Sequence, residues 1–205
     1  MNIIRIENPI FTSNTYIISS EKHNWVWLVD IGGVDGVINS LSKDSMVRGV
    51  FITHSHFDHI YGINKLIDTF PECIVFTSVE GKKGLYSEKL NLSFYHDEPI
   101  VFEGSNVQIL HENDKIELFE NCFLETIQTP GHDWSCLTFK VDNCLFTGDS
   151  FIPNVKVVTK LKGGNKEENI KSLAKIMSNI CENSIICPGH GEMSKIDALN
   201  PLSCY

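Results

Sequence analysis

The chain has 205 residues, of which 42% are hydrophobic and 21% charged, a composition typical of a packed globular protein and unlike an intrinsically disordered chain. Its 17 basic and 26 acidic residues give a formal net charge of −9, so a uniformly acidic surface would repel the phosphates of nucleic acids. The longest uninterrupted apolar run, Trp25 to Val29, is too short to span a bilayer, so we expect neither a nucleic-acid nor a membrane partner.

Short runs rich in Val, Ile, Phe and Trp, bounded by turn-forming residues, predict strands along most of the chain. In order, they lie at 3–6, 15–19, 25–30, 50–53, 74–77, 107–110, 115–118, 122–128, 136–141, 144–147 and 184–187. Apolar residues at three- and four-residue spacing predict helices at 34–41, 60–70 and 166–180. Residues 78–105 contain Gly81, Gly84 and Pro99, which break any long element. No linker-like stretch divides the chain, so we expect one domain over residues 1–205.

Several predicted strands run into a turn that carries a metal-ligating residue type. Apolar runs lead into His54, His132, Asp149 and His190. The strand that ends at Asp30 is built in the same way, and this acid would either support the site or stabilise its own turn. Because a sheet holds its loops rigid where strands end, ligand residues gather there. We expect these strand ends to meet at one edge and form a site.

The segment at residues 53–59 reads THSHFDH and packs three imidazoles and a carboxylate into six positions. In an extended stretch His54, His56 and Asp58 would point to one side and His59 to the other. A single tetrahedral ion cannot comfortably use all four groups from so short a loop, whereas a turn would divide them between two ions. Without a metal, four adjacent protonatable groups would repel one another or need separate partners. The segment therefore predicts a metal site.

This segment and three later ones resemble the metallo-β-lactamase superfamily, in its glyoxalase II-like hydrolase branch. The matching runs are THSHFDHIYG, TPGHDWSC, FTGDS and PGHGE, which follow one another between about Asp30 and Glu192. The resemblance implies an α/β fold of the αββα type, a sandwich of two mixed β-sheets flanked by helices. It also implies a binuclear metal centre at one edge of the sheets.

The same resemblance implies which residues bind the metals. The first ion would be held by His54, His56 and His132, the second by Asp58, His59 and His190, and Asp149 would bridge both. The family's usual metal is zinc, and iron or manganese is found in some members. Imidazole and carboxylate ligands without clustered cysteines suit any of these three ions at a catalytic site.

The chemistry of such a centre is hydrolysis. Zinc lowers the pKa of a bound water to about 7, so a bridging hydroxide would attack an ester, thioester or amide carbonyl. Asp58 would be the catalytic residue that orients this nucleophile. The resemblance favours a hydroxyacylglutathione-type thioester as the substrate. The sequence contains no GxSxG, P-loop or GxGxxG motif, so serine hydrolases and phosphate-binding enzymes have no support.

The sequence departs from the family pattern at three places. Trp134 follows His132 where relatives carry a small-residue turn, and its indole would line the pocket or simply pack. Lys160 stands where many small relatives carry an acid, so we predict that Lys160 or Lys162 attracts an anionic substrate tail, the alternative being a solvated basic loop. Only 15 residues follow His190, so we expect this chain to lack the helical domain that helps glyoxalase II enzymes hold glutathione.

Two other functions fit the same motifs. A persulfide dioxygenase resembles this chain in motif order but uses one iron. A non-enzymatic member would bind metal for structure or redox chemistry. Secreted β-lactam hydrolysis is less favoured because the N-terminus shows no leader, and a tRNA-processing nuclease would need a basic RNA-binding arm.

The cysteines predict a reducing compartment. There are seven, an odd number without a CxxC pair, at positions 73, 122, 136, 144, 181, 187 and 204. A disulfide framework belongs to short secreted chains, so we expect reduced, mostly buried thiols in a cytoplasmic protein. The sequence leaves the oligomeric state open.

Overall fold

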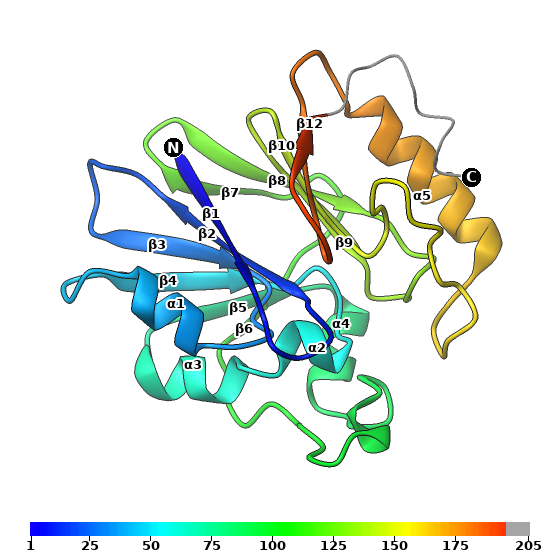
Figure 1. The fold of residues 1–205 in the computed structure, drawn as a ribbon, viewed down its shortest axis with the longest axis horizontal. Helices are drawn as coiled ribbons and strands as arrows, with labels where there is room; N and C mark the ends of the chain where they lie inside the picture. The colour runs from blue at the N-terminus through cyan, green and yellow to red at the C-terminus, as the bar shows by residue number, and fades with distance from the viewer. Residues whose placement is uncertain (196–205) are drawn as a thin grey trace.

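The computed structural model describes residues 1–195, and its N-terminal half forms a mixed sheet (Figure 1). The six strands of this sheet, in spatial order, are β1 (Asn2–Glu7), β2 (Asn14–Ser19), β3 (Trp25–Val29), β4 (Met46–Phe51), β5 (Ile74–Thr77) and β6 (Val107–Ile109). The β1, β2 and β3 strands are antiparallel, and β3 to β6 run parallel. Parallel neighbours place the ends of β3, β4 and β5 at one edge of the sheet, where the predicted ligand turns begin.

The second half of the chain forms another mixed sheet, also of six strands within the described residues. From one edge of the sheet to the other they follow chain order: β7 (Lys115–Phe119), β8 (Cys122–Gln128), β9 (Leu137–Val141), β10 (Cys144–Gly148), β11 (Ile185–Pro188) and β12 (Ser194–Lys195). Only β10 and β11 pair in parallel, and the turns after them carry Asp149 and His190.

Three layers of core hold these sheets and helices together. Apolar side chains of both sheets meet between them, among them Trp27 and Phe51 from the first and Phe139 and Phe146 from the second. On the outer face of the first sheet pack α1 (Asp35–Ser40) and α3 (Ile63–Thr69), and on that of the second packs α5 (Lys166–Ser178) (Figure 1). This arrangement is the predicted αββα sandwich.

The prediction of one helix at 60–70 is wrong at its start, because Ile60 ends one helix and a separate helix begins at Ile63. The α2 helix (Phe57–Ile60) ends before Gly62, and α3 follows. The backbone N–H of Gly62 donates to the carbonyl of Ile31 at 2.8 Å and so leaves the helical pattern. A Cβ at this position would lie 3.0 Å from the backbone of Gly33, so the chain passes close to the end of β3 here. This break lets α2 present its own residues to the sheet edge.

The segment at 78–105, for which no element is predicted, contains α4 (Val79–Leu85) and a 3-10 turn, η1 (Ser93–Tyr95). Ser78 caps α4, since its side chain accepts a hydrogen bond from the backbone N–H of Gly81 at 2.9 Å. Gly81 and Gly84 are buried, and a Cβ on either would overlap the side chain of Thr77 or Ser55. These glycines allow close packing and do not break the helix.

Among residues 1–195, no helix is both long and apolar enough to cross a membrane. Of the six described cysteines, none is in a disulfide, four are buried, Cys122 is half-buried and Cys181 is exposed. Cys204 lies outside the described residues. The single domain over residues 1–205 stays a prediction.

Candidate metal centre

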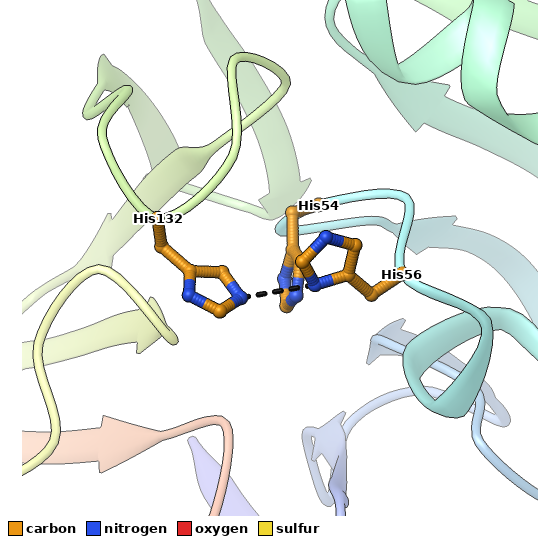
Figure 2. A group of neighbouring side chains, drawn as sticks. All are labelled: His54, His56 and His132. Atoms are coloured by element: carbon orange, nitrogen blue, oxygen red, sulfur yellow. Dashed lines mark hydrogen bonds between the residues drawn. The ribbon is translucent and has the colours of Figure 1, made fainter. Parts of the chain in front are cut away.

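Three imidazoles converge where β4 and β8 end (Figure 2). His54 and His56 follow β4, and His132 stands in the turn between β8 and β9. One ligand atom from each of the three lies within 4.8 Å of the others. The closest pair is Nε2 of His132 and Nδ1 of His56, 2.9 Å apart, so His56 turns its Nδ1 toward the group. The structure thus brings together the three residues predicted for the first ion.

A second group forms next to the first. Asp58 and His59 lie on α2, and His190 follows β11. Nε2 of His190 is 3.3 Å from Oδ2 of Asp58, and Nε2 of His59 is 3.6 Å from the same oxygen. The helix begins directly after His56, so the run from His54 to His59 is not extended throughout. That turn separates the four groups in the way the sequence predicts.

Asp149 lies between the two groups. Its Oδ2 is 3.6 Å from Nε2 of His132 and 3.5 Å from Nε2 of His190. Its Oδ1 is 3.5 Å from Nε2 of His59. One carboxylate therefore faces imidazoles of both groups, which is the position the sequence predicts for a bridging ligand.

The nitrogen and oxygen atoms of this centre are arranged to bind metal ions, and several of them have no hydrogen-bond partner within residues 1–195. The Nε2 atoms of His54 and His59 and the Oδ1 of Asp149 are buried and have no hydrogen-bond partner among the described residues. A buried polar atom without a partner costs about 1–3 kcal/mol. Nitrogen and oxygen donors in this number suit divalent zinc, iron or manganese, and the groups within 4.8 Å of one another can each surround one ion.

Contacts behind the imidazoles fix which nitrogen faces the site. Nδ1 of His59 is 2.9 Å from Oδ2 of Asp30, and Nδ1 of His132 is 2.8 Å from the carbonyl of Val158. Because these oxygens accept a hydrogen bond from Nδ1–H, Nε2 carries the free lone pair in the neutral form of each ring, the form that binds a metal. Asp30 therefore supports the site, which settles the alternative left open by the sequence.

Asp133 occupies the corresponding position behind His56. It is fully buried, and its Oδ1 accepts hydrogen bonds from the backbone N–H and the hydroxyl of Ser135. Within residues 1–195 its Oδ2 has no hydrogen-bond partner, nor has Nε2 of His56, which lies 3.9 Å away. A small rotation would join these two atoms in a hydrogen bond. Nothing in the sequence assigns Asp133 a role.

The electrostatics of the centre differ between the two groups. Burial lowers the pKa of His56 to about 3, and the imidazole of His132 adds to this effect, so His56 is neutral. Burial also disfavours the charged form of His59, but the carboxylates of Asp58, Asp149 and Asp30 outweigh it and raise its pKa to about 10. The pKa of Asp58 falls to about 2, since the nearby imidazoles of His59 and His190 outweigh burial.

The turn that carries His190 is held by the other sheet. The side-chain amide of Asn14 on β2 donates to the carbonyls of Pro188 at 2.9 Å and Gly191 at 2.8 Å. The hydroxyl of Tyr16 donates to the carbonyl of Pro188 at 2.7 Å. These bonds join the two sheets at the site, and no sequence motif pointed to them.

The two predicted substrate-binding residues lie outside the ligand groups. Trp134 is 44% exposed and lies beside Gly163, in the loop at residues 156–163 that also carries Lys160 and Lys162. Lys160 is exposed and lines a groove of about 540 Å³. The other residues of this groove, which we call the lysine–aromatic groove, are Lys89, Leu92, Phe94, Tyr95, Leu161 and Lys162.

Residues 9–190 match the metallo-beta-lactamase superfamily. A protein of Streptococcus pyogenes serotype M6 that carries the name "Probable metallo-hydrolase" is 27% identical over 205 residues, which cover 96% of this chain and 86% of that protein.

Two further matches concern an enzyme and a solved structure. The hydroxyacylglutathione hydrolase of Tolumonas auensis is 27% identical over 184 residues, which cover 84% of this chain but only 63% of that enzyme. The chain thus spans less than two thirds of this relative. The crystal structure of the BLEG-1 B3 metallo-beta-lactamase superposes with a TM-score of 0.86 at 23% identity and covers 95% of this chain and 94% of that one, which supports the fold.

Proposed function

The chain belongs to the metallo-beta-lactamase superfamily, and we propose that it is a hydrolase that works with two divalent ions, zinc favoured over iron or manganese. The position of Asp149 carries this proposal, because its carboxylate is within 3.6 Å of imidazoles from both ligand groups. The proposed ligands are His54, His56 and His132 for one ion and Asp58, His59 and His190 for the other, with Asp149 shared. When bound, the ions would polarise a carbonyl oxygen and lower the pKa of a water molecule.

We assign Asp58 a catalytic role beside its role as a ligand. Its pKa of about 2 keeps it a carboxylate at neutral pH, and its side chain is 13% exposed, so it can reach a water molecule in the site. A carboxylate accepts a hydrogen bond from attacking water and thereby directs the oxygen lone pair at the carbonyl carbon. The buried positions of His54, His59 and His132 keep bulk water away from the other side of the centre.

The lysine–aromatic groove is the proposed place for the substrate's tail. It is lined by Lys89, Lys160 and Lys162 and by the aromatic residues Phe94 and Tyr95, and no acidic residue among residues 1–195 lines it. In a chain of net charge −9, such a groove favours an anionic molecule with some apolar surface. A small thioester or ester with a carboxylate tail fits, and a hydroxyacylglutathione-type thioester is the favoured example.

Both walls of this groove are tied to the metal centre. On one side the carbonyl of Asn91, just before η1, accepts a hydrogen bond at 2.9 Å from the backbone N–H of Phe57 on α2. On the other side the loop of Lys160 supplies the Val158 carbonyl that binds His132. Trp134 lies at the same loop, where we propose that its indole forms part of the rim. A tail in the groove would therefore leave the scissile carbonyl near the ligand groups.

The test is a metal analysis followed by a thioester panel. Elemental mass spectrometry of protein purified without added metal or chelator should find two divalent ions per chain. The loaded protein should hydrolyse hydroxyacylglutathione and other anionic thioesters. The double variant Lys160→Ala/Lys162→Ala should raise KM for anionic thioesters and leave KM for a neutral thioester unchanged. Lys115→Ala removes a lysine of β7 that pairs with Glu125 and serves as the control.

Two outcomes would contradict the proposal. One iron per chain, with oxygen-dependent consumption of a persulfide, would favour the persulfide dioxygenase. Two retained ions without hydrolysis of any ester or thioester tested would favour a metal-binding or redox module. Equal KM values for anionic thioesters in the double variant and the parent would remove the assigned role of the lysines while leaving the hydrolase intact.

A further inference from the structure

We infer that a second groove, between α5 and the loop at residues 156–160, binds a small amphipathic anion, a carboxylate with a short aliphatic chain. Its volume is about 370 Å³, which lies within the range of small-molecule pockets. The lining residues that matter here are Lys156, Lys160, Lys166, Asn169, Ile170 and Leu173, and none of the seven proposed metal ligands lines it. We call it the α5 groove.

The charge of the α5 groove is positive and unbalanced. Among residues 1–195 three lysines line it and no acidic residue does. Within residues 1–195 none of the three is in an ion pair. By contrast, Lys171 and Lys175 on the same helix pair with Glu168 at 2.7 Å and Glu112 at 2.9 Å. Lysines left unpaired at one face of an acidic chain favour an anionic occupant.

The rest of the groove is apolar. Ile170 is 52% exposed although it is a large aliphatic side chain, and Leu173 lies one turn further along α5 on the same side of the groove. Val157 faces them from the loop. An inorganic anion would leave this surface in water, whereas an aliphatic chain would bury it. The combination therefore selects an anion with an apolar tail.

Asn169 gives the groove a buried polar group. It is only 8% exposed, it lines the groove, and its Oδ1 has no hydrogen-bond partner among the described residues. The NH2 group of the same side chain donates no hydrogen bond within residues 1–195, so it is free to donate to a carboxylate held by the lysines. The oxygen itself would need a donor such as a water molecule that enters with the ligand.

The α5 groove lies behind the turn of His132. Its loop wall supplies the Val158 carbonyl that binds Nδ1 of His132. Its helix wall is fixed to the same turn, since the hydroxyl of Ser172 donates to the carbonyl of Pro130 at 2.6 Å and the backbone N–H of Asn165 donates to that of Gly131 at 2.8 Å. An occupant would thus contact both segments that hold this proposed metal ligand in place.

The test uses octanoate as the probe and the full-length, metal-loaded protein. Octanoate should bind saturably and shift the NMR resonances of the Asn169 side-chain amide and of the backbone at 156–173. Acetate and octan-1-ol, which carry only the charge or only the chain, should bind more weakly. The double variant Lys156→Ala/Lys166→Ala should weaken octanoate binding about tenfold, because two ion pairs are lost. Lys171→Ala, outside the groove, should leave it unchanged.

Two results would overturn the inference. Octanoate that shifts only resonances of the ligand histidines would be binding at the metal centre through its carboxylate. Equal octanoate affinity in the double variant and the parent would show that the groove lysines do not bind it. Ile170→Glu, a change at an exposed position, provides an independent check, since it should abolish octanoate binding while thermal unfolding stays unchanged.

Discussion

The carboxylate of Asp30 joins His59 to the strand end that leads into His54. Its Oδ2 accepts from Nδ1 of His59 at 2.9 Å, and its Oδ1 accepts from the backbone N–H of Thr53 at 2.7 Å. The residue is 2% exposed and has a φ of 56°, in the left-handed region. A single buried acid thus positions parts of both ligand groups.

Replacing Asp30 should therefore weaken metal binding as well as the fold. In Asp30→Asn one oxygen remains for Thr53, but an NH2 group would face Nδ1 of His59. We expect the affinity for one of the two ions to fall about 10–100-fold and the free energy of unfolding to fall by about 1–3 kcal/mol. Competition with a chromophoric chelator and chemical denaturation measure these effects. Asp35→Asn, an exposed acid of α1, is the control, and an unchanged affinity in Asp30→Asn would mean that packing alone orients His59.

Asp133 offers a second test of how the imidazoles are held. Asp133→Ala removes the carboxylate that lies 3.9 Å from Nε2 of His56 and would accept a hydrogen bond from it when Nδ1 binds a metal, so metal affinity should fall about 10–100-fold. Asp133→Asn keeps an oxygen that can accept from the same nitrogen, and it should restore most of the affinity. Calorimetric zinc titration of both variants measures this. If both variants lose affinity equally, the effect comes from the lost bonds to Ser135, and the pairing with His56 is refuted.

Much of the fold and the ligand set follows from local sequence. The strands end where apolar runs stop, and the run from His54 to His59 carries its ligands in one short segment. Asp149 and His190 follow strands β10 and β11, which pair in parallel, so their turns lie side by side. Because parallel strands end at one edge, the meeting of these residues was predictable.

What the sequence did not reveal depends on contacts between distant segments. Asp133 meets His56 only because the two sheets pack face to face. The Val158 carbonyl meets His132 because two turns of the second half of the chain, 26 residues apart, lie together. Gly81 and Gly84 of α4 predict a break in the helix, but in the structure they allow close packing against Thr77 and Ser55. Local patterns carry no information on these tertiary contacts, which override the low helix propensity of glycine.

Gly189 illustrates a residue whose requirement is spatial. A Cβ at this position would overlap Oδ1 of Asp149 and lie 2.8 Å from Cε1 of His59. Gly189→Ala should therefore displace a proposed shared ligand, lower the metal content per chain and destabilise the fold by about 1–3 kcal/mol. Ser105→Ala, a change at an exposed position before β6, should keep both ions. Elemental analysis of the two variants decides, and full metal content in Gly189→Ala would contradict the placement of Asp149.

The last prediction concerns the metal-free protein at alkaline pH. Burial disfavours the charge on His59, but Asp58, Asp149 and Asp30 raise its pKa from 6.5 to about 10. A histidine whose pKa is higher in the folded state contributes stability that is fully present below pH 6.5 and is lost as the pH rises through about 10. The free energy of unfolding of chelator-treated protein should therefore decline between pH 7 and pH 10.

The metal-loaded protein and one variant separate this effect from general alkaline denaturation. A bound ion requires a neutral imidazole, so zinc-loaded protein should not show the decline that His59 causes. His59→Asn has no imidazole to lose a proton, so its metal-free form should have a flatter pH profile over the same range. Denaturant titrations at several pH values measure all three. An equally steep decline in His59→Asn would show that the carboxylates around His59 do not hold its proton.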